Sequence, residues 1–157
     1  MKVRLVAVGR VRGPLAALVH EYEVRAGRYW KLEVREVAAG AGGGRGSPAR
    51  VREAEAERLV AELPPDLEVV ALTRAGDPMT SPALARYLDG LAVSASPGVA
   101  FAIGGAFGLA PVVLERARRM LSLSAMTLPH EMARLVLAEQ LYRAGTIVRG
   151  EPYHRSP

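Results

Sequence analysis

Residues 99–105 of the chain read Val-Ala-Phe-Ala-Ile-Gly-Gly, a run of five apolar residues that ends in two glycines. An apolar run without alternation is typical of a strand that is buried on both faces, as the strands of a parallel sheet are. The glycines that follow predict a turn in which the backbone can approach a neighbouring group closely. This segment therefore predicts a central strand whose carboxyl end opens into a loop.

The rest of the chain alternates strand and helix patterns around this strand. Strands are predicted at 3–8, 31–37 and 67–72, and a shorter one runs through 121–123. Helices are predicted from Pro14 to Tyr22, over 49–63 and 82–91, from near Pro111, and from Pro129 through Leu141. The alternation predicts an α/β fold with a mainly parallel sheet flanked by helices. Ligands of such sheets bind at the carboxyl ends of strands, which selects the loops after Leu72, Ile103 and Leu123.

Length and composition limit the classes of protein. The 157 residues suit one domain, 1–157. The chain has no cysteine, its three histidines are scattered, and no apolar run reaches the roughly 20 residues that cross a bilayer. We therefore expect a cytoplasmic protein with no metal site and no membrane segment. The net charge of +5 comes almost entirely from arginine and suits an anionic partner such as RNA, although arginine usage typical of a GC-rich genome would give the same charge.

Three segments contain candidate functional residues. The loop 104–108 lacks the spacing of a dinucleotide fingerprint and the lysine of a phosphate loop, so it is either a cofactor loop or a plain turn. The helix that follows Pro129 has a broad apolar face through Met132, Leu135, Val136 and Leu141, which suggests a subunit interface. The end of the chain is either a disordered tail or a functional one in which Tyr153 stacks on a base, His154 handles a proton and Arg155 reaches phosphate. His20 has no such neighbours and is predicted to lie on a helix surface.

Several motifs together resemble one family. They are Leu-Ser-Leu-Ser-Ala-Met-Thr-Leu-Pro-His at 121–130, Glu-Gln-Leu-Tyr-Arg-Ala at 139–144, Pro-Tyr-His-Arg at 152–155 and Leu-Val-Ala-Val-Gly at 5–9. They resemble the SPOUT-class large-subunit ribosomal RNA methyltransferase H family, which methylates N3 of a pseudouridine in 23S rRNA. The resemblance covers nearly the whole chain.

The resemblance implies a SPOUT-type α/β-knot fold. The C-terminal third, about 100–157, would form a trefoil knot, the site for S-adenosyl-L-methionine (SAM) and the interface of a homodimer. The substrate would be 23S rRNA within the assembled 70S ribosome. Carried over by motif, the residues that contact the methyl donor are Leu72, Gly104, Gly105, Leu123, Ser124, Ala125, Met126, Thr127 and Leu128.

For catalysis, His154 is the first candidate to accept the N3 proton, and Arg143 and Arg155 would stabilise the developing anion. Tyr153 would stack or hold the tail, which would reach the donor bound by the other subunit. His130 is the competing base, although a structural hydrogen bond in the first turn of its helix is favoured.

Two loops depart from the family pattern. Ala106 and Phe107 replace a proline and a frequent glutamate in the glycine loop, and Gly42-Gly43-Gly44-Arg45 replaces a loop that usually contains lysine. Arg45, Arg50 and Arg52 could still neutralise phosphates. Two other functions remain open: a SPOUT methyltransferase for another rRNA or tRNA base, and a ribosome-associated protein that binds SAM without transferring methyl.

Overall fold

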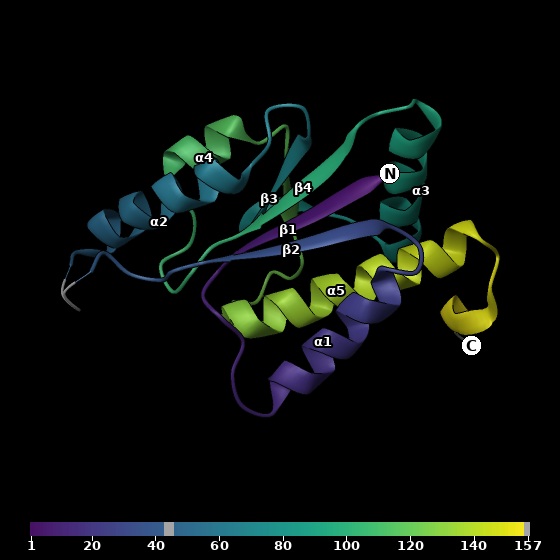
Figure 1. The fold of residues 1–157 in the computed structure, drawn as a ribbon, viewed down its shortest axis with the longest axis horizontal. Helices are drawn as coiled ribbons and strands as arrows, with labels where there is room; N and C mark the ends of the chain where they lie inside the picture. Colours follow the sequence, from purple (N-terminus) through teal and green to yellow (C-terminus); the bar gives the residue numbers. More distant parts are fainter. Residues whose placement is uncertain (43–45, 156–157) are drawn as a thin grey trace.

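The computed structural model describes residues 1–42 and 46–155, and its centre is a five-stranded sheet (Figure 1). The strands are β1 (Lys2–Val8), β2 (Lys31–Val37), β3 (Glu68–Pro78), β4 (Gly98–Ile103) and β5 (Arg119–Ser122). They lie in the order β2-β1-β4-β3-β5, and every neighbouring pair is parallel. The predicted parallel α/β sheet is thereby confirmed.

Helices cover both faces of this sheet (Figure 1). Helices α1 (Leu15–Ala26), α3 (Ser81–Val93) and α5 (His130–Val148) pack on one face, and α2 (Pro48–Glu62) and α4 (Pro111–Arg116) pack on the other. A short 3₁₀ helix, η1 (Pro152–His154), follows α5. Because β4 lies between β1 and β3, Phe101 is buried in the first core and Ala100 and Ala102 in the second. This is why its sequence shows no polar alternation.

Local sequence signals start two of the helices where they were expected. The Oγ of Ser47 accepts a hydrogen bond of 3.2 Å from Arg50 N, and Pro48 follows. The Oγ1 of Thr80 accepts one of 3.2 Å from Ala83 N, with Pro82 in the first turn. Each side chain satisfies one of the free amides at a helix start, and each proline occupies a position that needs no amide hydrogen.

The segment after Leu72 differs from the predicted plain loop. Leu72 pairs with Leu121, the next four residues leave the ladder, and Asp77 pairs with Leu121 again. Gly76 lies so close to β5 that a Cβ atom there would be 2.7 Å from the carbonyl carbon of Met120. Periodicity could not predict this return, because it depends on a contact with a strand more than 40 residues further along the chain. Residues 73–76 thus form a bulge within β3, called loop 73–76 below, whose two ends pair with the same residue, Leu121.

The broad apolar face of α5 has an explanation within one chain. Helices α1 and α3 both pack against α5, which buries Leu137, Leu141 and Ala144 fully. Met132 remains 36 % exposed and Leu135 and Val136 are half-buried. The width of the face therefore does not by itself require a second subunit. No helix within the described residues is long and apolar enough to cross a membrane.

Candidate functional site

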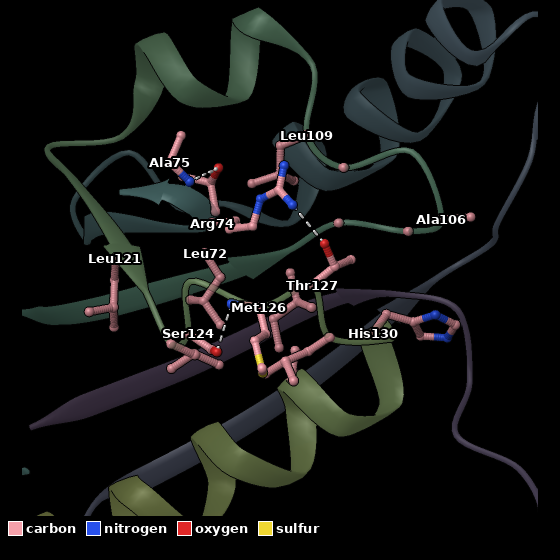
Figure 2. A pocket seen from close by; sticks show the side chains of 18 residues that line it. Leu72, Arg74, Ala75, Ala106, Leu109, Leu121, Ser124, Met126, Thr127 and His130 are labelled. Carbon is pink, nitrogen blue, oxygen red and sulfur yellow. Dashed lines mark hydrogen bonds between the residues drawn. The ribbon is translucent and has the colours of Figure 1, made fainter. Parts of the chain in front are cut away.

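A cavity of about 360 Å³ lies where three loops meet at the carboxyl ends of β3, β4 and β5 (Figure 2). These are the three loops that strand position alone selected. The most buried of the lining side chains, those of Ile103 and Leu121, are apolar and are called the floor of the cavity below. Glycines of the loop 104–108 also line it. The cavity is lined by Leu72, Thr73, Arg74, Ala75, Ile103, Gly104, Gly105, Ala106, Gly108, Leu109, Leu121, Leu123, Ser124, Met126, Thr127, Leu128, His130 and Ala133.

The cavity brings together most of the predicted donor contacts. Eight of the nine lie in its lining: Leu72, Gly104, Gly105, Leu123, Ser124, Met126, Thr127 and Leu128. Ala125 is exposed and does not line it. Short-range bonds shape this loop, because Ser122 Oγ donates to Ser124 O at 3.0 Å and Met126 N donates to Ser124 Oγ at 2.9 Å.

The glycine loop is glycine-rich for steric reasons. A Cβ atom on Gly104 would lie 2.7 Å from the carbonyl carbon of Gly108, which is backbone and cannot rotate away. A Cβ on Gly105 would lie 2.9 Å from Glu55 Oε2. Gly108 has a φ of +79°, a conformation that favours glycine. Close approach to neighbours, in addition to the turn itself, therefore requires these glycines.

Glu55 is a buried charge that the sequence did not reveal. It belongs to α2, whose sequence is rich in charged residues, yet it is only 3 % exposed. Its Oε2 accepts a hydrogen bond of 3.0 Å from Gly40 N, and its Oε1 is buried without a partner among the described residues. Glu55 thus packs the glycine loop against the segment that precedes residue 43.

The arginines expected to contact RNA differ in environment. Arg50 is exposed at the start of α2. Arg52 Nη1 lies 3.4 Å from the carbonyl oxygen of Phe107 and so touches the glycine loop. Gly43, Gly44 and Arg45 lie outside the described residues.

Two ionisable residues of the lining were not predicted as donor contacts. Arg74 lies on the loop between the two pairings of β3 with Leu121, and its Nη1 donates to Thr127 Oγ1 at 2.9 Å. His130 begins α5, and its Nε2 lies 3.1 Å from Glu131 Oε1 and against Gly9. The imidazole therefore lies beside Gly9, just after the end of β1.

The predicted catalytic residues lie at the other end of α5. They are Arg143, Tyr153, His154 and Arg155, and none of them lines the cavity. At 1.5 Å per residue, Arg143 lies about 20 Å along α5 from His130, and the tail packs beside Arg143. Within one chain the tail therefore lies outside the lining of the cavity. His20 is exposed on α1, as predicted.

The tail is ordered by contacts with its own helix. Tyr153 Oη donates to Glu139 Oε1 at 3.0 Å, and Arg143 forms an ion pair of 2.7 Å with the same oxygen. Burial and the hydrogen bond to Glu139 both raise the pKa of Tyr153, so its phenol stays protonated at neutral pH. The hydrogen bond to Glu139 also raises the pKa of Arg143. These contacts exclude the disordered alternative for 152–154.

His154 differs from its neighbours in the tail. Its Nδ1 is buried and has no hydrogen-bond partner among the described residues. Arg155 is exposed, and Glu151 accepts a hydrogen bond from Tyr29. Arg143 is fixed by its ion pair with Glu139. His154 and Arg155 form no such ion pair with a carboxylate of the described residues.

Comparison with known proteins assigns this chain to a family. The family model described as "Predicted SPOUT methyltransferase" matches residues 1–154. The chain belongs to the SPOUT methyltransferases. It is also 54 % identical, over 99 % of its length and 100 % of the relative's, to the ribosomal RNA large subunit methyltransferase H of Gemmatimonas aurantiaca. The protein of the same name from Rubrobacter xylanophilus is 50 % identical over 98 % of both chains. This SPOUT methyltransferase thus belongs to the large-subunit methyltransferase H family.

Solved structures agree on the fold. A methyltransferase from Bordetella pertussis superposes with a TM-score of 0.57 at 16 % identity, covering 91 % of this chain and 95 % of that one. A Legionella pneumophila methyltransferase in complex with SAM superposes with a TM-score of 0.51 at 12 % identity. That match covers 90 % of this chain and 65 % of the Legionella chain. At such identities the likeness concerns the fold alone.

Proposed function

We propose that this SPOUT methyltransferase transfers the methyl group of SAM to N3 of a pseudouridine in 23S rRNA, on the assembled 70S ribosome. The observation that supports this best is the cavity, which gathers eight of the nine residues that the family motifs select. The chain also covers the full length of a relative named ribosomal RNA large subunit methyltransferase H. Residues 1–157 would form one catalytic domain, which also binds the RNA.

The cavity suits SAM in size and chemistry. A volume of about 360 Å³ lies in the range of small-molecule sites. Leu72, Leu123 and Leu128 offer apolar contact to an adenine ring, while the backbone of Gly104 and Gly105 is open to a close approach. Bound there, SAM supplies a methyl group activated by a positively charged sulfur. The protein therefore has mainly to position the base and remove its proton.

The proton on N3 is assigned to the tail. His154 is a neutral base when unprotonated, and among the described residues its buried Nδ1 has no hydrogen-bond partner that would fix it in another role. Arg155 and Arg143 stabilise the negative charge that develops on the base as the proton leaves. Tyr153 holds the tail in place through Glu139 and stays protonated.

A homodimer reconciles the position of the tail with that of the cavity. Because the tail packs beside Arg143, about 20 Å along α5 from His130, and does not line the cavity of its own chain, the tail of one subunit would serve the cavity of the other. The exposed side of α5, with Met132, Leu135 and Val136, is available as the interface. A trefoil knot is supported by β3, which pairs with Leu121 on both sides of loop 73–76 while the segment after β5 contacts that loop through Thr127. Residues 100–157 would then contribute the knot, most of the donor site and the interface.

Ribosomes from a strain that lacks the modification provide the test. We expect methyl transfer from labelled SAM to one pseudouridine of 23S rRNA in 70S particles, mapped by mass spectrometry of nuclease fragments. Free 23S rRNA should be a much poorer substrate, because only the assembled particle presents the target in its folded surroundings. A methylated tRNA or another rRNA base would assign a different substrate. SAM binding without any methyl transfer would leave only a SAM-binding protein.

A further inference from the structure

The donor cavity contains one permanent charge, which belongs to Arg74. Its other ionisable side chain is that of His130, and none of the residues that line the cavity is acidic. Arg74 forms no ion pair with a described carboxylate and makes one side-chain hydrogen bond, to the neutral hydroxyl of Thr127. A guanidinium has five N–H donors, so most of those of Arg74 remain available.

The backbone holds Arg74 in place. Residues 73–76 lie between two pairings with Leu121, so the loop is anchored at both ends. Gly76 presses against the backbone of β5, and Ala75 N donates to Thr73 Oγ1 at 3.3 Å within the loop. Figure 2 shows the Arg74 side chain extending toward Thr127, and a dashed line marks the hydrogen bond between them. The cation is thus presented at the rim by a fixed loop.

From this placement we infer that Arg74 binds the carboxylate of the methionine part of SAM. The inference rests on the proposed function, since it names a contact of the same donor. A planar guanidinium suits a carboxylate because two parallel N–H groups meet two oxygens. The apolar floor suits the adenine ring, which leaves the charged end of the donor for the polar rim. Thr127 would orient the fork, because it already fixes one of the guanidinium nitrogens across the cavity.

A contact with RNA phosphate is the competing role for Arg74. Several exposed arginines elsewhere, such as Arg10, Arg12 and Arg50, are free to meet phosphates without lying in a cavity. Arg74 instead lines the wall that encloses the donor and is tied to the loop on its opposite side. These two observations favour the donor carboxylate.

Two ligands separate the roles in a calorimetric titration. S-adenosylhomocysteine has the carboxylate, and 5′-methylthioadenosine has the same nucleoside and sulfur but lacks the amino-acid part. We expect Arg74→Met to weaken binding of S-adenosylhomocysteine by about tenfold to a hundredfold, the loss of a charged hydrogen-bonded pair, and to change binding of 5′-methylthioadenosine by less than about twofold. Arg74→Lys should recover part of the loss. Arg86→Met, which removes an exposed arginine from α3, is the matched control and should change neither affinity.

Each other outcome overturns the inference. Equal weakening of both ligands would show that Arg74 only supports the loop. Unchanged affinity for both ligands, with a raised KM for ribosomes, would assign Arg74 to RNA. Failure of the proposed function would be distinguishable from failure of this inference. In that case the protein without any substitution would either bind neither of the two ligands or transfer no methyl group.

Discussion

The two ends of α5 are built in different ways. At its start, one chain alone assembles a cavity from three loops, and close backbone contacts hold those loops. At its end, the tail is ordered by Glu139 and Tyr29, and neither His154 nor Arg155 lines that cavity. The difference teaches that, under the proposed function, one chain alone would bind the donor, whereas proton transfer would need the tail of a second copy.

The largest expected effect is on the donor end. Gly104→Val would place a branched side chain where even a Cβ atom lies 2.7 Å from the Gly108 backbone, so the glycine loop has to move. We expect the affinity for S-adenosylhomocysteine to fall by about a hundredfold or more, since overpacking against fixed backbone costs a few kcal/mol. Titration calorimetry measures the change. Retained affinity would show that this loop does not enclose the donor.

A matched glycine tests whether that effect is specific. Gly90 lies within α3, and a Cβ atom there would meet nothing within 4 Å. Gly90→Ala should therefore leave donor affinity unchanged and raise the unfolding free energy slightly, by about 0.5–1 kcal/mol, because alanine favours the helix. Loss of donor binding in this variant would indicate a global effect of glycine replacement.

The next effect concerns the tail end. His154→Ala removes the proposed base, and we expect kcat to fall by about a hundredfold while donor affinity stays unchanged. Turnover on unmodified ribosomes and calorimetry measure the two quantities separately. The exposed histidine on α1 provides the control, so His20→Ala should retain full turnover. Full turnover in His154→Ala would remove the base assignment.

Mixing the two defects tests whether the ends act across subunits. Subunits with Gly104→Val and with His154→Ala can be co-expressed with different tags and purified as the mixed dimer. One of its two sites then combines an intact cavity with an intact tail, so we expect about half of the unmodified activity. Activity no higher than that of the separate variants would show that each tail serves its own chain. Failure to recover any mixed dimer would contradict the dimer itself.

The sequence predicted the donor end better than its internal contacts. The apolar run of β4 and the glycines after it identified the cavity, because burial of a parallel strand leaves a continuous local signal. The sequence did not predict Arg74 as a residue of the cavity, because its position depends on Leu121 pairing on both sides of loop 73–76. The sequence did not predict the burial of Glu55 either, because a glutamate among other charged residues of a helix resembles a solvent-exposed one. Long-range contacts of this kind have no periodicity.

Residue types suggested a function for the tail, and the resemblance then selected the functional tail over the disordered one. Residues 152–155 are too few to show any periodicity, and composition left both an ordered and a disordered tail open. In the structure, η1 is held by the hydrogen bond from Tyr153 to Glu139 and by the rings of Tyr142 and Tyr153, whose centroids lie 4.5 Å apart. The width of the apolar face of α5, by contrast, suggested a subunit interface. The packing of α1 and α3 against α5 within one chain largely explains that width. An amphipathic pattern reports the area that is buried and not which chain buries it.

The smallest expected effect tests how firmly the tail is held. Tyr153→Phe removes the hydrogen bond of 3.0 Å to Glu139 but keeps the ring that stacks on Tyr142 and lies 5.0 Å from Arg143. Glu139 keeps its ion pair with Arg143, so we expect a loss of about 1 kcal/mol in unfolding free energy, measured by urea denaturation, and only a few-fold lower kcat. Tyr142→Phe, whose hydroxyl has no side-chain hydrogen bond among the described residues, should change neither quantity. A loss of turnover as large as that of His154→Ala would instead place the Tyr153 hydroxyl among the groups that contact the RNA.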